Sequence, residues 1–396
     1  MFMSEKIRKG MESGSWIRRM FDEGNIMKKH YGVDNVFDLT LGNPIMEPPE
    51  AFFTELKNLA NNPVPGMHRY MENAGYLETR AAVASHLAKE TNLKLTAGDI
   101  VMTCGAAGAM NVILKTILNA GEEVIIFTPY FMEYFNYIDN HGGIPKFVPT
   151  DEQFLPNPDA LEKAINKKTR AIIINSPHNP TGVVYSADLM RQIGEVLRKK
   201  ETQYGTEIYL LSDEPYRKLI YDGLKYPSPL LFHRRAIIAM SHSKDLALPG
   251  ERIGYIAIHP ECPQKEELML GLIYCNRTLG FVNAPAMMQH IVRYLQDVTV
   301  SIADYEKKRD FLYENLVEIG YSLVKPQGAF YMFPKSPIPD DVAFVRALQE
   351  DMVLAVPGVG FGGQGHFRIS YCINDRTLAG AVEGLRKTAK KFGLKN

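Results

Sequence analysis

The chain has few cysteines and no excess of charge of either sign. Its 396 residues include four cysteines, none of them in the CxxC spacing typical of zinc or redox sites. Lys and Arg together number 45, as do Asp and Glu, so the formal net charge is zero. A balanced charge gives no electrostatic basis for binding nucleic acid. The scattered cysteines favour a reducing compartment and predict neither disulfides nor a metal site.

Long apolar runs are also absent. No stretch reaches the ~18 residues that a membrane-spanning helix requires. The N-terminal run MFMSEKIRKGMESGSW is charged throughout and lacks the apolar core of a signal peptide. The sequence therefore predicts a soluble, cytoplasmic protein with no membrane partner.

Short apolar runs, by contrast, alternate with helical patterns along much of the chain. This alternation is the signature of an α/β fold with a mostly parallel sheet. Helix start signals lie between the runs, at Asn157 with Pro158 and at Ser186. The expected strands are residues 99–103, 122–127, 144–148, 170–175, 207–212, 236–240 and 254–258.

The pattern changes after about Pro285. A long helical stretch through Asp304 and Asn315 precedes four strand-like runs, at residues 321–324, 328–333, 352–356 and 366–370. A chain of this length is too long for one compact core, so we expect two domains. The predicted division is an N-terminal arm with part of the small domain (1–45), a large domain (46–285) and a small α+β domain (286–396).

Lys244 stands in the most informative run, SHSKDLALPGERIG. An apolar strand ends in Ser241, and Ser243, Lys244 and Arg252 follow within eleven residues. A lysine amine can hold an aldehyde as a Schiff base, and hydroxyl and guanidinium donors suit a phosphate. The run therefore suits a site for pyridoxal 5'-phosphate.

A second phosphate-binding feature lies in the run CGAAGAMNVILKTIL. Gly105, Ala106 and Ala107 form a turn of small residues directly after a strand and before an apolar helix. Bare backbone N–H groups at a helix N-terminus bind anions. We expect this turn to meet the same phosphate as Ser241, Ser243 and Arg252.

Two charged residues fall where an unpaired charge would be costly. Asp213 ends an apolar strand in YLLSDEPYRKLIY, and the protonated nitrogen of the cofactor's ring would give its carboxylate a cationic partner. Arg368 lies inside a strand-like run, GHFRISY, where its guanidinium should face a carboxylate. Asp213 also precedes Lys244 by 31 residues, so the two motifs support each other.

In content and order, these runs resemble the motifs of the class I/II pyridoxal phosphate-dependent aminotransferases, from about Gly42 to Arg368. The segment NSPHNPTG is similar to the family's NPxNPTG element. The resemblance implies that Asn179 and Tyr216 bind the phenolic oxygen of the cofactor, and that Phe131 in TPYFMEY stacks on its ring.

The resemblance also assigns residues on the substrate side. It implies that Arg368 binds the α-carboxylate of the substrate in a two-pronged pair and that Gly42, in LTLGNPIMEPP, lines the substrate side. Tyr70, in RYMENAGYLETR, matches a tyrosine that reaches the phosphate of the neighbouring subunit. A homodimer with sites at the subunit interface is therefore implied.

The fold that the resemblance implies is fold type I, with a mostly parallel seven-stranded sheet in the large domain and a smaller α+β domain. The implied reaction is ping-pong transfer of an amino group between an L-amino acid and a 2-oxo acid. In it, Lys244, Asp213 and Tyr216 are the catalytic side chains, and Lys244 moves the proton at the substrate's α-carbon.

Other functions share some of these motifs. C–S lyases, which catalyse β-elimination, and aminocyclopropane carboxylate synthases use the same cofactor and related motifs. Some transcription regulators carry a similar domain behind a DNA-binding domain, but only about forty residues precede Gly42 here. The spacing GVGFGG, residues 358–363, matches a dinucleotide-binding pattern, yet a strand rather than a helix is expected after it, which argues against a dehydrogenase.

The sequence leaves the substrate side chain open. A dicarboxylate would need a second cation, and no motif singles out one of the available basic residues, Arg18, Arg19, Arg69, Lys218 and Arg277. An aromatic surround for a large apolar side chain is equally available from Trp16, Tyr70, Phe330 and Tyr331.

Overall fold

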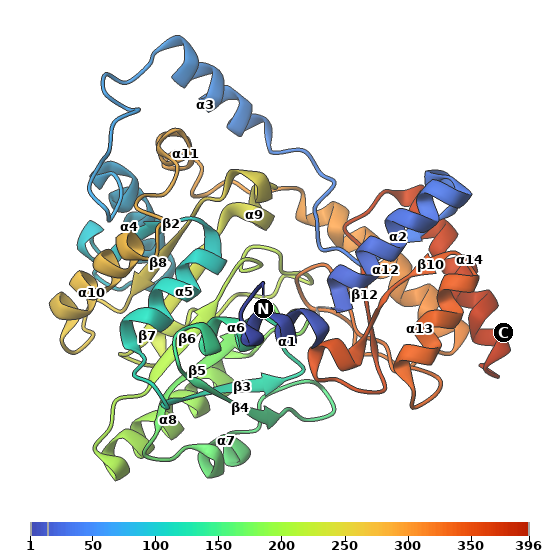
Figure 1. Cartoon of the computed structure of the whole chain (residues 1–396). Helices are drawn as coiled ribbons and strands as arrows, with labels where there is room; N and C mark the ends of the chain where they lie inside the picture. The colour runs from blue at the N-terminus through green and yellow to red at the C-terminus, as the bar shows by residue number, and fades with distance from the viewer. Residues whose placement is uncertain (1, 14–15, 395–396) are drawn as a thin grey trace.

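The structure, a computed structural model, describes residues 2–13 and 16–394. Its largest feature is a seven-stranded sheet in the order β2-β8-β7-β6-β5-β3-β4 (Figure 1). All strands are parallel except β8, which runs antiparallel to both of its neighbours. The strands are β2 (Ile100–Thr103), β3 (Glu123–Thr128), β4 (Ile144–Pro149), β5 (Thr169–Asn175), β6 (Tyr209–Asp213), β7 (Ala236–Ser241) and β8 (Gly254–Ile258). Each of the seven strands predicted from the sequence is thereby confirmed.

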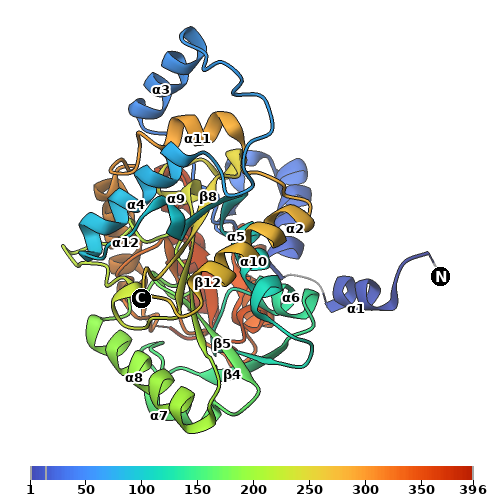
Figure 2. The same cartoon turned by 90° about the vertical axis from the view of Figure 1, so that its left-hand side faces the viewer.

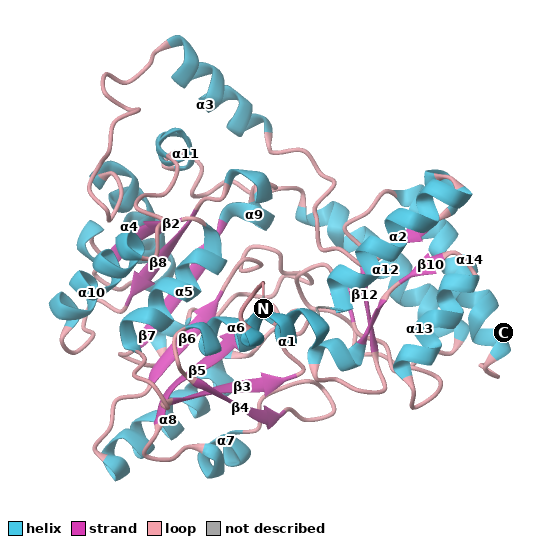
Figure 3. Cartoon of the chain, in the orientation of Figure 1, coloured by secondary structure: helices cyan, strands magenta, loops and turns pink. Residues whose placement is uncertain are grey.

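Helices cover both faces of this sheet, because its strands are apolar on both sides. In β5, Ile172 and Ile174 pack toward one layer of helices, and Ala171 and Ile173 toward the other. The first layer contains α3 (Glu50–Asn61), α4 (Leu77–Thr91), α7 (Pro158–Ala164), α8 (Ala187–Tyr204) and α11 (Ala286–Val292). The second contains α5 (Gly105–Ile117), α6 (Glu133–Asn140) and α10 (Lys265–Thr278). Figure 3 shows the slanted strands between these helices.

Two helix starts that the sequence predicts are confirmed. The side chain of Asn157 caps α7, with Pro158 as the first helical residue, and Ser186 caps α8 by accepting a hydrogen bond from the N–H of Leu189.

A second lobe lies at the other side of the molecule in Figure 1, where both ends of the chain contribute. Its core holds residues from α2 (Trp16–Tyr31), α12 (Ile302–Ile319), α13 (Asp341–Glu350) and α14 (Asp375–Lys391). It contains two small sheets: β1 (Phe37–Asp38) pairs with β10 (Val353–Leu354), and β12 (Phe367–Ser370) lies between β9 (Tyr331–Met332) and β11 (Val356–Pro357). The short helix α1 (Glu5–Ser13) projects from the body in Figure 2.

One strand predicted for this lobe is wrong. Residues 321–324 form no strand. The ring of Tyr321 packs against Phe344 and Phe367, and its hydroxyl donates to the carbonyl of Leu385. An apolar run can therefore be buried by helices and rings without pairing in a sheet.

The domain boundaries at residues 45 and 285 stay a prediction. Met288, Ile291 and Leu295 belong to the apolar core beneath the large sheet, together with the strands of that sheet. We propose on this packing that the large domain extends to about Leu295.

Candidate active site

A cavity of about 310 Å³ lies where three parallel strands of the large sheet end. Asn175, Asp213 and Ser241 are the last residues of β5, β6 and β7, and all three line it. This edge is where ligands bind in open parallel sheets. The lining is completed by Gly42, Ala106, Ala107, Met110, Phe131, Tyr137, Asn179, Pro215, Tyr216, Ser243, Lys244, Pro249, Arg252, Tyr331 and Arg368.

Lys244 enters the cavity from α9 (His242–Asp245), directly after β7. Its Nζ donates a hydrogen bond to the carbonyl oxygen of Gly42 at 2.7 Å and lies 5.7 Å from the centre of the Phe330 ring. Burial lowers the pKa of Lys244 to about 8. Near neutral pH a useful fraction of this amine is therefore unprotonated and nucleophilic.

Asp213 presents an unpaired carboxylate oxygen. Its Oδ2 accepts a hydrogen bond from the hydroxyl of Tyr134 at 2.6 Å. Its Oδ1 is buried and has no hydrogen-bond partner within residues 2–13 and 16–394. Burial raises the pKa of Asp213 to about 7. A buried carboxylate of this kind needs a cation, and the protonated nitrogen of a pyridine ring meets that need.

Arg368 carries a positive charge, opposite in sign to that of an ionised Asp213, and no acidic side chain in the described part of the chain neutralises it. Its side chain is 2% exposed and lies between the rings of Tyr331 and Phe361, whose centres are 4.6 and 4.7 Å from its guanidinium carbon. No acidic side chain in the described part of the chain acts on its charge, and its Nε is buried without a hydrogen-bond partner there. Burial lowers the pKa of Arg368. The site can accept a carboxylate from a ligand.

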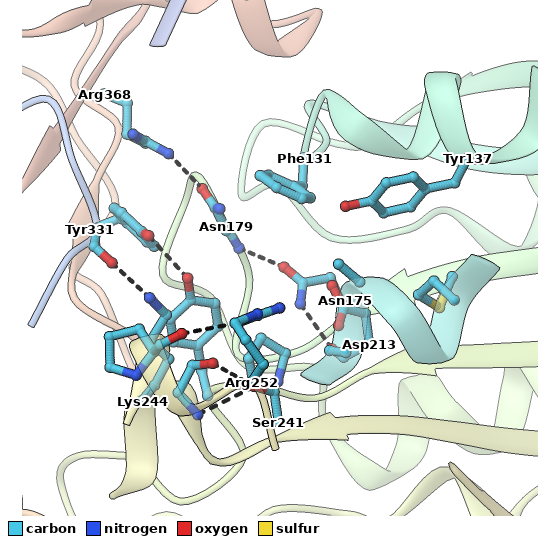
Figure 4. A pocket seen from close by; sticks show the side chains of 18 residues that line it. Phe131, Tyr137, Asn175, Asn179, Asp213, Ser241, Lys244, Arg252, Tyr331 and Arg368 are labelled. Carbon is cyan, nitrogen blue, oxygen red and sulfur yellow. Dashed lines mark hydrogen bonds between the residues drawn. The ribbon is translucent and has the colours of Figure 1, made fainter. Parts of the chain in front are cut away.

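A run of hydrogen bonds joins Arg368 to Asp213 (Figure 4). Arg368 Nη1 donates to Asn179 Oδ1 at 3.1 Å, and the N–H of Asn179 donates to Asn175 Oδ1 at 2.7 Å. Asn175 Nδ2 in turn donates to the carbonyl oxygen of Asp213 at 2.8 Å. Asn175 therefore fixes both the loop that carries Asn179 and the end of β6.

The cavity wall near Arg252 has the properties of a phosphate site. The first turn of α5 places Ala106 and Ala107 in the wall, and Cys104 at the N-cap forms no side-chain bond to that turn. The helix N-terminus can therefore offer N–H groups to an anion. Ser241 and Ser243 lie opposite with their hydroxyl oxygens 2.5 Å apart.

Gly105 lets Arg252 approach this wall. Gly105 has a φ of +75°, and a Cβ built on it would lie 2.8 Å from Nη2 of Arg252. Arg252 also donates to the carbonyl oxygens of Pro249 and Cys104, at 3.0 and 3.3 Å. A side chain at position 105 would push the guanidinium away from the helix N-terminus.

Tyr216 and Tyr331 meet on the side of the cavity that faces the second lobe. Their hydroxyl oxygens lie 2.9 Å apart. A Cβ on Gly42 would lie 1.7 Å from the Tyr331 hydroxyl oxygen, so only glycine fits at position 42 beside this ring.

The structure brings most of the predicted site residues together. Twelve of the fourteen line the cavity; Gly105 lies behind Arg252, and Tyr70, which is 91% exposed, is outside it. Sequence reasoning gave no role to Tyr134, Asn175 and Tyr137, although Asn175 ends a predicted strand, which is a usable signal.

Among the residues considered for the substrate side chain, only Tyr331 lines the cavity formed by the described part of one chain. Lys218 is used elsewhere, because it donates to the carbonyl oxygens of Gln296 and Val298. Trp16 lies against Gly360, where Arg19 stacks over its ring.

Comparisons with known proteins agree with this geometry. Residues 34–385 match the family model described as aminotransferase class I and II. A probable aspartate aminotransferase of Methanocaldococcus jannaschii is 32% identical over 344 residues, which cover 84% of this chain and 88% of that protein. Aromatic-amino-acid aminotransferase 2 of Thermococcus litoralis is 32% identical over the full length of both chains.

A solved structure extends the match to the whole fold. The crystal structure of an aminotransferase from Eubacterium rectale superposes with a TM-score of 0.96 at 37% identity, covering 99% of this chain and 100% of that one. No helix within the described residues is long and apolar enough to cross a membrane.

On the family match, the relatives and the superposed structure, the chain belongs to the class I and II aminotransferases, and it is a pyridoxal phosphate-dependent aminotransferase of fold type I.

Proposed function

We propose that the cavity around Lys244 is the catalytic site, in which an amino group moves between an L-amino acid and a 2-oxo acid. One observation carries this proposal. Two buried charged side chains line the same cavity as Lys244. Asp213 has a carboxylate oxygen without a hydrogen-bond partner among the described residues, and Arg368 has no acidic partner among them. A charged ring and a substrate carboxylate are the two groups that would neutralise them.

Pyridoxal phosphate fits the remaining walls of the cavity. We assign its phosphate to Ser241, Ser243, Arg252 and the N-terminus of α5 with Gly105, Ala106 and Ala107. We assign its phenolic oxygen to Asn179 and Tyr216, one face of its ring to Phe131, and its ring nitrogen to Asp213. When bound, the cofactor supplies an aldehyde that joins to an amine and a ring that takes up electrons from the substrate's α-carbon.

Lys244 has two roles in this proposal. Its amine would hold the aldehyde of the cofactor. Once the amino group of the substrate takes that place, the amine of Lys244 would be free to accept the proton of the substrate's α-carbon and to return a proton. Because burial lowers the pKa of Lys244 to about 8, the amine can accept and return a proton near neutral pH.

Arg368 orients the substrate for this proton transfer. Its stacking between Tyr331 and Phe361 keeps the guanidinium plane fixed, so both N–H groups can meet the two carboxylate oxygens. Arg368 donates hydrogen bonds to Thr40 and Asn179, and a carboxylate is a stronger acceptor than either. Gly42 lies beside this position and leaves room for the substrate.

We also propose that the enzyme acts as a homodimer in which Tyr70 reaches the phosphate of the partner subunit. Tyr70 is 91% exposed and lies between α3 and α4, outside the cavity of its own chain. Leu77 and Tyr294 are further exposed apolar side chains, at 61% and 59%.

The four free cysteines support a cytoplasmic location.

A single-turnover experiment tests the proposed reaction. The cofactor-loaded enzyme is mixed with alanine, glutamate, aspartate or phenylalanine in turn. At least one of them should remove the visible absorption of the lysine-bound cofactor and yield one equivalent of 2-oxo acid. If the whole panel is inert while cystathionine releases pyruvate and ammonia, the reaction is β-elimination.

A further inference from the structure

Tyr134 contacts the carboxylate of Asp213, and the proposed reaction gives Tyr134 no role. It lies in the first turn of α6 and is 2% exposed. Its hydroxyl donates to Oδ2 of Asp213 at 2.6 Å, whereas Oδ1 has no hydrogen-bond partner within the described residues. The two oxygens of one carboxylate therefore have different surroundings.

We propose that Tyr134 is a positioning residue that turns Asp213 so that Oδ1 meets the ring nitrogen of the cofactor. This inference rests on the proposed role of Asp213. Asn175 holds the carbonyl oxygen of Asp213 at 2.8 Å, which fixes the backbone at the end of β6. Rotation of the carboxylate about its side-chain bonds is the freedom that remains, and the Tyr134 hydrogen bond removes it.

The same ring supports the aromatic cover of the cavity. The rings of Phe131 and Tyr134 pack edge to face, with centres 5.5 Å apart and planes at 81°. Phe131 lines the cavity, where we place it against the face of the cofactor's ring. Tyr134 therefore contacts both the residue proposed for the ring nitrogen and the residue proposed for the ring face.

Tyr134 also affects the charge of Asp213. A hydrogen bond to a carboxylate favours its ionised form. Burial of Asp213 and the adjacent Glu214 carboxylate both act against ionisation of Asp213. The charge of Asp213 also acts on two other titratable groups, Tyr137 and Tyr216. Burial raises the pKa of Tyr134 well above its ordinary value, so its hydroxyl stays protonated and remains a donor.

Tyr134→Phe tests the proposal, because it removes the hydroxyl and keeps the ring. Pyridoxal phosphate labelled with nitrogen-15 in the ring reports by NMR whether the ring nitrogen is protonated. Without Tyr134 the Asp213 carboxylate is more basic, so the shared proton should move toward Asp213. The ring-nitrogen signal should shift toward that of a neutral pyridine. Cofactor affinity should fall about tenfold, and kcat should fall more than KM changes.

Two further variants make the outcome specific. Tyr209→Phe removes the hydroxyl of a buried tyrosine in β6, the strand that ends in Asp213, and should match the wild type in both measurements. Asp213→Asn should shift the ring-nitrogen signal further than Tyr134→Phe does. A wild-type signal and affinity in Tyr134→Phe, with a shifted signal in Asp213→Asn, would overturn the inference and leave the proposed function intact. A wild-type signal in Asp213→Asn would remove Asp213 from the ring nitrogen.

A substitution that strengthens the hydrogen bond from residue 134 should shift the ring-nitrogen signal in the opposite direction to Tyr134→Phe. Incorporation of 3-fluorotyrosine at position 134 keeps the shape of the side chain and makes its hydroxyl a stronger donor. The ring-nitrogen signal should then move toward the protonated form. A shift in the same direction as that of Tyr134→Phe would contradict the proposal, even if Tyr134→Phe protein folds poorly.

Discussion

Arg368 on β12 donates a hydrogen bond to Asn179, which lies after β5, so the small three-stranded sheet and the large sheet meet inside the cavity. The second guanidinium nitrogen donates to the carbonyl oxygen of Thr40 at 2.5 Å. Three distant parts of the sequence are thus joined at the position proposed for the substrate carboxylate.

Arg368→Lys should raise the KM for the amino acid by about 10- to 100-fold. A lysine cannot form two parallel bonds to a carboxylate, and the lost charge-assisted bond is worth ~1.5–3 kcal/mol. Titration calorimetry of a carboxylate inhibitor with the wild type and with Arg368→Lys measures the difference. Equal affinities would place the carboxylate site elsewhere.

Lys244→Ala should fold normally and lose the visible absorption band of lysine-bound pyridoxal phosphate. Lys244 is the lysine that lines the cavity in the described part of the chain. Absorption spectroscopy of the purified variant after cofactor addition checks this, with circular dichroism as the control for folding. An unchanged band would show that another lysine holds the cofactor.

Asp213→Asn should stabilise the cofactor-free enzyme at pH 8 while weakening its function. Burial raises the pKa of Asp213 from 3.8 to about 7, so the folded protein holds this proton more tightly than the unfolded chain does. The protonated carboxyl is tolerated below pH 4, and the cost of burying the charge grows until about pH 7.

At pH 8 this cost is fully present, and the asparagine avoids it, which gives a gain of about 2–4 kcal/mol. Thermal unfolding of the two cofactor-free proteins between pH 4 and pH 8 measures the effect. The gain should shrink as the pH falls, and a gain independent of pH would assign it to packing instead of charge.

Mixing two inactive variants should restore activity if Tyr70 serves the partner subunit. A hybrid dimer of Tyr70→Ala and Lys244→Ala chains has one site with both defects and one intact site. After random reassociation about a quarter of all sites should be intact, because half of the dimers are hybrids. Sedimentation confirms the dimer, and activity that stays at the level of the parents would place Tyr70 in its own chain's site.

The sequence predicts the large sheet well because most of its strands are short runs of apolar, buried residues. Asp213 and Lys244 follow from the same pattern, since Asp213 is the last residue of β6 and Lys244 lies in the short helix that follows β7. The second lobe is harder to predict: β9, β10 and β11 have two residues each, too few for an alternating pattern. There the run at residues 321–324 looks like a strand and is not one.

Within the site, the contacts that sequence reasoning missed are those between side chains from different elements. Tyr134 is an ordinary apolar-face residue of α6 until the fold places Asp213 beside it, 79 residues along the chain. The pairing of Tyr216 with Tyr331 spans 115 residues. No local spacing encodes either contact, because both depend on how the sheets and helices are assembled.

The reversed direction of β8 determines where this protein tolerates a change of length. Because β7 and β8 are antiparallel, both Ser241 and Gly254 lie at the cavity edge, and the chain between them carries Lys244 and Arg252. Inserted residues in that stretch would displace the lysine relative to the arginine. The parallel strands return through helices on the sheet faces, so added residues at the far ends of those crossovers leave the cavity unchanged. An engineer who grafts a loop or tag into this enzyme should therefore choose the far ends and leave the stretch from Ser241 to Gly254 at its native length.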